Sequence, residues 1–172
     1  MAFIRCAKAA AVVVAVGVCL GASPAQAAIP AKLQAVLIAK ILKYDRTLSD
    51  REPAATRIVI VAQAEGNAGK VKSFLSSLGF DAAVVQKVAE VDNNANAVYL
   101  LDGKPQAVAK LAASNQLLSL TNNVNAVEAG SISVGLRLKS NGRPEIVVNL
   151  KRLKKEGHEF ASGLLRVARV LR

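Results

Sequence analysis

The sequence predicts an α/β domain with a mostly parallel sheet, helices on both faces of that sheet, and a C-terminal antiparallel hairpin and terminal helices. Three observations support this class. Two largely apolar runs are typical of strands buried on both faces: residues 57–62, which are mostly β-branched, and residues 97–101. Segments with apolar residues at helical spacing lie around them. After residue 130 the apolar residues alternate on either side of Asn141-Gly142, which is typical of an antiparallel hairpin.

Residues 1–27 have the features of a secretory signal peptide. Arg5 and Lys8 supply the basic start, residues 9–20 are apolar, and Ala25-Gln26-Ala27 forms a small-residue cleavage site. Because a membrane-spanning helix needs roughly 20 apolar residues, a cleaved signal is favoured over a retained membrane anchor. We therefore expect export to the periplasm and a single domain over residues 28–172.

The composition of the predicted mature chain excludes thiol chemistry. Both cysteines of the sequence, Cys6 and Cys19, lie within residues 1–27, so no disulfide and no cysteine-ligated metal is expected in the domain. Of 23 basic residues, Arg5 and Lys8 leave with the signal, so 21 basic residues face 12 acidic ones, a net charge of +9. Such a chain must hold its fold by packing alone.

Elements before residue 80 alternate between helix and strand. Apolar residues at helical spacing predict an amphipathic helix over residues 33–48. The run 57–62 predicts the first buried strand. Gly66 then opens a second helix, which we expect to end at Gly79, since glycine is favoured just beyond a helix C-terminus.

The alternation continues to residue 120. Residues 83–88 form a weaker strand pattern, and residues 97–101 form a second strand of the buried type. A helix is predicted over 104–113 and a third short strand over 117–120. Strands alternating with helices predict a parallel sheet with right-handed crossovers.

The remaining chain predicts a hairpin and two helices. Apolar and polar residues alternate over 131–139, which predicts a strand with one solvated face, and residues 144–150 return antiparallel after the turn. Asn149 is placed to cap a short helix over 150–156, and Gly157 ends it. The apolar face of residues 160–171 predicts a last helix.

Catalytic motifs match poorly. Residues 64–71 are similar to a phosphate-binding loop, but Ala64 replaces the first glycine and Val71 replaces the magnesium-binding hydroxyl, so an ordinary strand-to-helix connection is favoured. Residues 130–135 are similar to a nucleophile elbow with the wrong serine spacing. His158, the single histidine, is interpreted as a solvent-facing loop residue. We expect no bound cofactor and no metal.

Paired carboxylates are the remaining route to catalysis, because two acids across a sugar could hydrolyse a glycoside. The acidic residues in question lie in predicted turns or at helix ends, where acids usually cap and solubilise: Asp45, Asp50, Glu65, Asp81, Asp92 and Asp102. An enzyme is therefore the third hypothesis, and it requires a pocket that gathers two of these acids, or that places His158 beside one.

Positive charge is concentrated at the C-terminal end. Residues 137–172 hold ten Lys or Arg and three Glu, whereas residues 58–136 hold five basic and six acidic residues. This predicts a basic surface for an acidic protein, anionic lipid or polysaccharide, although a solvated helix surface would have the same pattern. The partner-binding candidates are Lys151, Arg152, Lys154, Lys155, Arg166 and Arg169. Nucleic acid is a poor candidate partner, because aromatic residues are not interleaved with the basic ones.

The order of motifs resembles the YfiR family. The sequences VEAG at 127–130, RPEIVVNL at 143–150 and EGHEFASGLLRVARV at 156–170 are similar to the closing signature of that family. The first predicted helix agrees, with Ile-Pro at 29–30, Leu-Gln-Ala at 33–35, Lys-Ile-Leu at 40–42 and Tyr-Asp-Arg at 44–46. The resemblance extends from about residue 29 to residue 171.

The resemblance implies a Rossmann-like periplasmic domain without catalytic activity. The best-known member restrains an inner-membrane diguanylate cyclase by binding its periplasmic part, and it works as a dimer, so a homodimer is implied here. Two departures limit the transfer. The mature chain lacks the cysteines that the well-known members use for disulfides, and residues 129–133 replace a stretch that usually contains Gly-Gly. No binding residue of the family is transferred.

The leading hypothesis is therefore a non-catalytic periplasmic regulator that binds, and inhibits, a membrane sensor such as a diguanylate cyclase, in cyclic-di-GMP signalling and biofilm control. The alternative is an envelope binding module that holds an anionic glycan or lipid through the C-terminal basic surface. Salt dependence separates the two, because a mainly electrostatic contact weakens strongly as ionic strength rises.

Overall fold

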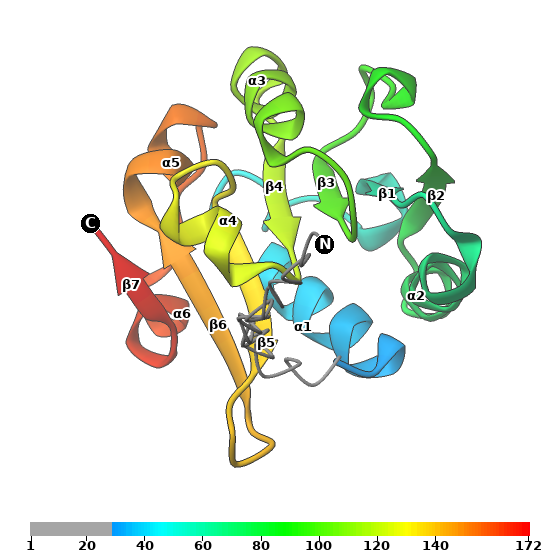
Figure 1. Ribbon diagram of the computed structural model, residues 1–172. Coiled ribbons are helices and arrows are strands. Elements are labelled where there is room, and N and C mark those ends of the chain that lie inside the picture. Colours follow the sequence, from blue (N-terminus) through cyan, green and yellow to red (C-terminus); the bar gives the residue numbers. More distant parts are fainter. Residues whose placement is uncertain (1–28) are drawn as a thin grey trace, which may run out of the picture.

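The computed structural model describes residues 29–172, so the predicted signal peptide lies outside the described residues (Figure 1). The helices are α1 (Ala31–Tyr44), α2 (Glu65–Ser77), α3 (Pro105–Asn115), α4 (Val124–Glu128), α5 (Leu150–Lys155) and α6 (Ser162–Val167), with 3-10 turns at Pro53–Ala55 and Val88–Glu90. The strands are β1 (Arg57–Val61), β2 (Asp81–Val85), β3 (Ala97–Leu100), β4 (Leu118–Thr121), β5 (Val134–Leu138), β6 (Pro144–Asn149) and β7 (Arg169–Leu171).

One sheet of seven strands, in the order β2-β1-β3-β4-β5-β6-β7, forms the centre of the domain. Strands β1 to β5 are mutually parallel, and β6 runs antiparallel to β5. Strand β7 pairs parallel with β6 and forms one edge. The predicted class is therefore confirmed: a mostly parallel α/β sheet with a C-terminal antiparallel hairpin.

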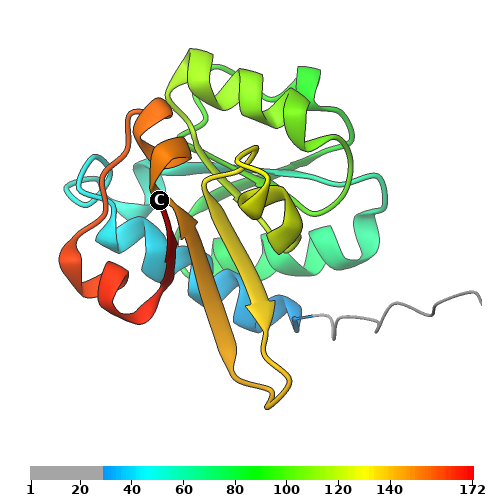
Figure 2. The ribbon, with the colours of Figure 1, turned by 60° about the vertical axis from the view of Figure 1, so that its left-hand side comes forward.

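Helices cover both faces of the sheet (Figure 2). Helices α1, α2 and α6 pack on one face, in a core that includes Ile58, Ile60 and Leu120. Helices α3 and α4 pack on the other face, where Val59 and Val98 are buried. From Ile58 onward, successive residues of β1 enter opposite cores, which explains why this part of the strand is apolar throughout.

A buried hydrogen-bond chain ties the start of the described chain to the sheet. The Tyr99 hydroxyl on β3 donates to Gln34 Oε1 on α1 at 2.7 Å, and Gln34 Nε2 donates to the Ile29 carbonyl at 2.6 Å. Burial raises the pKa of the Tyr99 phenol.

Among residues 29–172, no helix has both the length and the apolar composition needed to cross a bilayer.

Helix α4, which the sequence analysis did not identify, covers the β4–β5 crossover. Asn123 Oδ1 accepts a hydrogen bond from the Asn125 amide at 3.2 Å and caps this helix. Gly135 on β5 allows the close approach, because a Cβ there would lie 2.9 Å from Val127 Cγ2. A five-residue helix is too short for a clear helical period, so packing against β5 decides its formation.

The prediction of one helix over residues 160–171 was wrong. Helix α6 ends at Val167, Ala168 is extended with φ −86° and ψ 151°, and Arg169–Leu171 form strand β7 beside β6. Val167, assigned to the apolar face of the predicted helix, is 76% exposed. The β-branched and apolar tail suits either element, and the unpaired edge of β6 supplies the hydrogen bonds that favour a strand.

Candidate functional site

Helix α5 follows β6 directly and lies at the end of the sheet where β4 begins (Figure 1). Asn149 caps it as predicted, because its Oδ1 accepts a hydrogen bond from the Arg152 amide at 2.9 Å. The helix presents two different surfaces. Leu153 and Arg152 are buried, whereas the three lysines Lys151, Lys154 and Lys155 are exposed.

A buried acidic residue just beyond α5 fixes the helix to the sheet. Glu156 is fully buried and accepts hydrogen bonds from the Ser119 amide at 3.0 Å, the Ser119 hydroxyl at 2.6 Å and the Ser133 hydroxyl. Arg152 Nε donates to the same carboxylate at 2.8 Å, one helical turn away. Since the Glu156 carboxylate already accepts four hydrogen bonds from the protein, the cluster stabilises the structure and its carboxylate is occupied.

The structure divides the six partner-binding candidates. Arg152 points inward, pairs with Glu156 and also donates to the Ala109 carbonyl of α3, so its side chain does not join an exposed patch. Arg169 on β7 is half-buried and pairs with Glu128. Arg166 is exposed on α6, a separate element. The exposed set that one element brings together is Lys151, Lys154 and Lys155.

These three lysines, which we call the α5 lysine face, differ from the neighbouring basic residues. Within residues 29–172, none of them has a carboxylate oxygen within 4.0 Å, whereas Arg152 and Arg137 each contact one carboxylate and Arg169 contacts two. A shallow cavity of about 60 Å³ between Lys151, Lys155 and the loop before β5 lies at the side of this face. Unpaired cations attract an anionic surface more effectively than paired ones.

The interpretation of His158 as a solvent-facing residue was wrong. Its side chain is 4% exposed, and Nδ1 lies 2.6 Å from Oδ2 of the fully buried Asp45. Thr47 Oγ1 lies 2.8 Å from the same nitrogen, and Nε2 lies 3.1 Å from the Gln116 carbonyl. Sequence reasoning missed this contact because 113 positions separate Asp45 from His158, and folding alone brings them together.

The arrangement around His158 does not match a catalytic triad. In a triad one ring nitrogen contacts the acid and the other contacts the nucleophile. Here Thr47 and Asp45 share the Nδ1 side, and Nε2 is occupied by the Gln116 carbonyl. The ring therefore has no free nitrogen with which to take a proton from a substrate.

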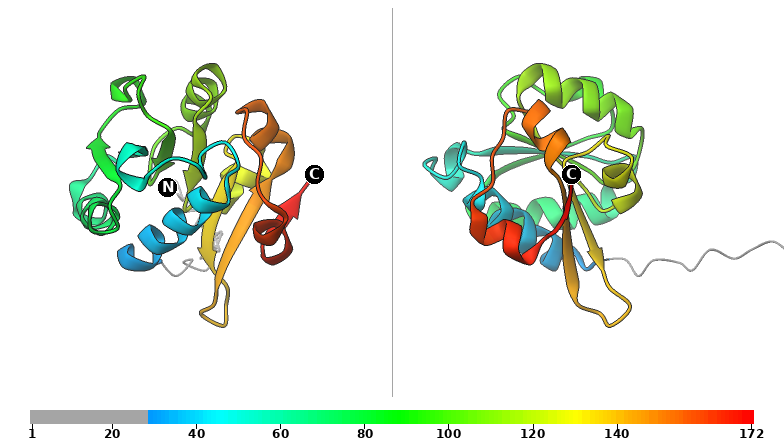
Figure 3. Two further views of the ribbon diagram at one scale, coloured as in Figure 1. Left: turned by 180° about the vertical axis from the view of Figure 1, so that it is seen from behind. Right: turned by 90° about the vertical axis from the view of Figure 1, so that its left-hand side faces the viewer.

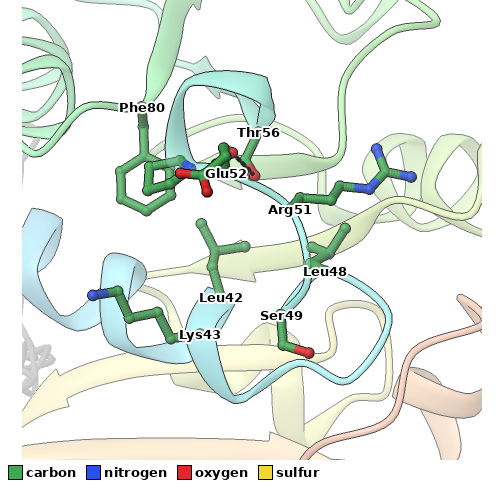
Figure 4. Close-up of a pocket in the computed structure, with 9 residues that line it drawn as sticks. Leu42, Lys43, Leu48, Ser49, Arg51, Glu52, Thr56 and Phe80 are labelled. Atoms are coloured by element: carbon green, nitrogen blue, oxygen red, sulfur yellow. Dashed lines mark hydrogen bonds between the residues drawn. The ribbon is translucent and has the colours of Figure 1, made fainter.

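A cavity of about 440 Å³ lies between the end of α1 and the start of β2 (Figure 4). In Figure 4 Leu42 lies between Phe80 and Leu48, Glu52 lies beside Phe80, and the Arg51 side chain extends away from the centre. The cavity contains one carboxylate, and none of the six acids considered for glycoside chemistry lines it. The geometry suits a small amphipathic group better than a two-carboxylate reaction.

Two of the six acidic residues considered for glycoside chemistry, Asp81 and Asp92, form ion pairs with Arg57. Arg57 donates through Nη1 to Asp81 at 2.6 Å and through Nε to Asp92 at 2.8 Å, which joins the start of β1 to β2 and to the loop before β3. The hydrogen bond from Arg57 holds the pKa of Asp92 below its ordinary value. These carboxylates are thus occupied by a structural ion pair.

The other acid with a lowered pKa lies in the hairpin. Glu145 on β6 is partly buried, which alone would raise its pKa, but hydrogen bonds from Arg137 and Lys139 of the β5 side hold the pKa below its ordinary value. The Arg137 contact crosses the strand pair at 2.5 Å. The ion pairs of Glu145 with Arg137 and Lys139 therefore stabilise the hairpin of β5 and β6.

The segment similar to a phosphate-binding loop is already helical. Helix α2 begins at Glu65, so Gly66 and Gly69 lie in its first two turns and do not form an extended phosphate cradle. The amide of Gln63 before the helix donates to Asp102 Oδ1 at 2.6 Å, which links the connections after β1 and β3. In the part of the chain from residue 29 onward, no group of three His, Cys, Asp or Glu side chains could hold a metal ion.

The fold and these clusters define a Rossmann-like α/β domain whose buried polar residues stabilise packing and whose outer α5 surface is basic. The family model described as YfiR/HmsC-like matches residues 31–169. The chain therefore belongs to the YfiR/HmsC-like family, as its motifs had indicated. No protein of curated function is significantly similar to it in sequence.

Two solved structures share the fold. The chain is similar to a conserved domain protein from Vibrio cholerae O1 biovar El Tor, with 14% identity and a TM-score of 0.61 over 83% of this chain and 60% of that one. It is also similar to an ABC domain in complex with L-Trp from Streptococcus pneumoniae, with 16% identity and a TM-score of 0.57 over 83% of this chain and 62% of that one. The chain thus spans about 60% of the length of these structures, which share its fold alone.

Proposed function

We propose that the protein is a non-catalytic periplasmic regulator that binds the periplasmic domain of a membrane sensor and inhibits that sensor. Membership of the YfiR/HmsC-like family is the observation that carries this proposal, because the family model covers nearly the whole described domain. The occupied state of His158, Glu156 and Asp92 gives independent support, since each would otherwise be a candidate for acid or base catalysis.

Inhibition requires no chemistry by the bound protein. A sensor that exchanges between active and inactive states shifts toward the state that the regulator binds more tightly. Shifting a sensor from 1:99 to 99:1 requires about 10⁴-fold tighter binding to the inactive state. The proposed sensor is a diguanylate cyclase, so the output would be cyclic-di-GMP and biofilm formation, and the regulator would act as a homodimer in the periplasm.

The α5 lysine face is the proposed contact with an acidic surface of the sensor. Its three side chains project from one short helix that Glu156 fixes to the sheet, so the face is held rigidly. The fixed backbone of α5 needs no rearrangement when it binds, so only the lysine side chains lose conformational entropy, and the concentrated charge speeds encounter with an acidic partner.

Direct binding tests this proposal. The chain from residue 28 to residue 172 is titrated against the purified periplasmic domains of diguanylate cyclase sensors from its own organism, and affinity is measured by calorimetry. The variant Lys151→Glu/Lys154→Glu/Lys155→Glu should weaken binding at least about hundredfold, since close charged pairs contribute several kcal/mol. The matched control Lys70→Glu/Lys72→Glu/Lys104→Glu, at exposed lysines elsewhere, should retain affinity within about threefold.

A second function, binding of anionic glycan or lipid, is favoured because, among residues 29–172, the lysines of the α5 lysine face form no ion pair with a carboxylate. In that case vesicles of phosphatidylglycerol or an acidic polysaccharide retain the protein at low salt, and retention falls steeply toward physiological ionic strength. Retention that the α5 charge reversal leaves unchanged would reject this function. Failure of every sensor domain to bind would reject the regulatory proposal.

A further inference from the structure

Strand β7 forms the edge of the sheet that lies opposite β2. It pairs parallel with β6 on one side, with Val147 opposite Arg169 and Asn149 opposite Leu171. In the right-hand view of Figure 3, β7 runs in front of the sheet from α6 toward α5. An edge strand directs part of its N–H and C=O groups away from the sheet, where a further strand can pair with them. The sheet can therefore be extended at β7.

Apolar side chains beside this edge are open to solvent. Val167, at the end of α6, is 76% exposed, whereas the other exposed large apolar residues between positions 29 and 172, Tyr44 and Leu78, are each 43% exposed. All three residues of β7 are partly exposed. Val170 stands opposite Val148, which belongs to the core on the α6 side, so Val170 faces that side as well. Exposed apolar surface thus lies next to the backbone of β7.

Basic residues stand on either side of this apolar surface. Arg166 precedes Val167, and Arg172 follows β7; both are exposed. Among residues 29–172, neither of these two arginines forms an ion pair with a carboxylate side chain, whereas Arg169 is already paired with Glu128. Free cations at both ends of an apolar strip complement a segment that is apolar at its centre and acidic at its ends.

The α5 lysine face continues the basic edge. Asn149 stands opposite Leu171 and is the residue before α5, so the helix begins beside the end of β7, and the two elements are in contact. Lys151, in the first turn of α5, is therefore close to the end of the strand. A partner that pairs with β7 can reach the α5 lysine face without a second binding site.

The same charges act against a second copy of this chain. If two copies of β7 paired with each other, Arg166, Arg169 and Arg172 of one copy would approach those of the other, and like charges on facing strands are destabilising. The strand is also short, a further feature by which edge strands avoid self-pairing. An acidic strand replaces this repulsion by attraction. The edge therefore favours an acidic partner over a homodimer contact.

We propose that an extended segment of the sensor's periplasmic domain adds to the seven-stranded sheet beside β7, with apolar residues at the centre of the segment and acidic residues at its ends. This inference rests on the proposed function, because it assigns the segment to the sensor. Backbone hydrogen bonds to β7 supply affinity, and contacts with Val167 and Val170 bury the apolar centre. Arg166 and Arg172 select the acidic ends.

A peptide probe tests strand addition without the sensor. The acetylated and amidated peptide Asp-Glu-Val-Thr-Val-Thr-Glu-Asp is titrated into the nitrogen-15-labelled chain from residue 28 to residue 172. We expect saturable shift changes at amides 167–172, a Kd below about 1 mM, and increased hydrogen-exchange protection of amides 169–171. The same peptide with N-methyl groups on its four central amides retains the charges and side chains but loses the backbone donors. It should bind at least about tenfold more weakly.

Charge reversal tests the selection of acidic ends. At an ionic strength of about 0.15 M, Arg166→Glu/Arg172→Glu should weaken binding of the probe at least about fivefold, because two attractive contacts become repulsive. The control Lys70→Glu/Lys72→Glu reverses two exposed charges on α2, which packs beside the opposite edge strand β2, and should leave the affinity within about twofold. Equal loss of affinity in both variants would show that net charge alone attracts the probe, which would overturn the proposal.

Three further outcomes would also overturn strand addition: no shift change at about 5 mM probe, shift changes confined to α5, or equal binding of the N-methylated probe. Protection of amides 169–171 that rises with protein concentration in the absence of the probe would show self-pairing and would contradict the assignment to an acidic segment. A sensor domain that binds without protecting amides 169–171 rejects this inference alone. Binding of the probe together with failure of every sensor domain to bind rejects the proposed function alone.

Discussion

The substitution Glu156→Gln should destabilise the domain by about 3–5 kcal/mol. The carboxylate is fully buried and accepts four hydrogen bonds, from Arg152 Nε, the Ser119 amide, the Ser119 hydroxyl and the Ser133 hydroxyl. Each bond to a charged group contributes about 1.5–3 kcal/mol, but desolvation of the carboxylate offsets part of the sum. Removing the charge leaves the guanidinium of Arg152 uncompensated, and breaking a buried pair on one side costs about 3–5 kcal/mol.

Urea denaturation at pH 7 measures this loss as a decrease in the free energy of unfolding at constant m-value. A domain of this size has about 5–15 kcal/mol of stability, so the variant should unfold at a much lower urea concentration. Combining Glu156→Gln with Arg152→Met should cost less than the sum of the single changes, by at least about 1 kcal/mol. The exposed neighbour Lys155→Gln is the control and should stay within about 0.5 kcal/mol of wild type. A loss below about 1 kcal/mol for Glu156→Gln would refute the buried cluster as the anchor of α5.

Three further predictions use the same denaturation assay. Gly135→Ala should cost about 1–3 kcal/mol, because its Cβ would lie 2.9 Å from a valine methyl of α4, and an unchanged midpoint would contradict that close approach. Tyr99→Phe should cost about 1–3 kcal/mol, since it leaves the buried Gln34 Oε1 without its donor, and equal stability would show that the bond contributes nothing. Arg57→Gln should be most destabilising at neutral pH, because the ion pair lowers the pKa of Asp92 in the folded state. The stability that this pair contributes is present above the unfolded-state pKa of Asp92 and is lost as the pH falls through the folded-state pKa. If wild type and variant still differ in free energy of unfolding below about pH 2, this linkage is wrong.

The parallel core of the sheet could be predicted because its signal is local. Residues 57–61 and 97–100 are apolar on both faces, a pattern that few other elements produce, and both form strands. The hairpin was equally clear from alternation and from Asn141-Gly142, where Gly142 has φ +74°. The weak strand predicted over 83–88 lies at Asp81–Val85, because pairing with β1 sets its register.

The end of the chain could not be predicted in the same way. Residues 167–171 fit a helical apolar face and also a short strand, and the open edge of β6 decides between them. Helix α4 has no sequence period of its own, so its existence depends on the surface of β5 that it covers. Both elements depend on tertiary contacts, which the local secondary-structure propensities of the residues do not report.

The buried polar clusters were missed for a related reason. Arg152 and Glu156 are four residues apart on a basic helix, which usually indicates an exposed pair. A signal was present in Ser119 and Ser133, two polar residues at apolar strand starts that need a buried partner. No residue near His158 in the sequence indicates that its side chain contacts Asp45, so this contact could be found only in the structure.

Inhibition of a sensor is the central claim, and enzymatic output measures it most directly. A full-length diguanylate cyclase sensor from the same organism is reconstituted in nanodiscs, and its rate of cyclic-di-GMP synthesis is followed while the chain from residue 28 to residue 172 is added on the periplasmic side. We expect a saturable fall in rate, which the α5 charge reversal at Lys151, Lys154 and Lys155 abolishes and the control reversal at Lys70, Lys72 and Lys104 preserves. Rates that remain constant for every such sensor at saturating protein would contradict it.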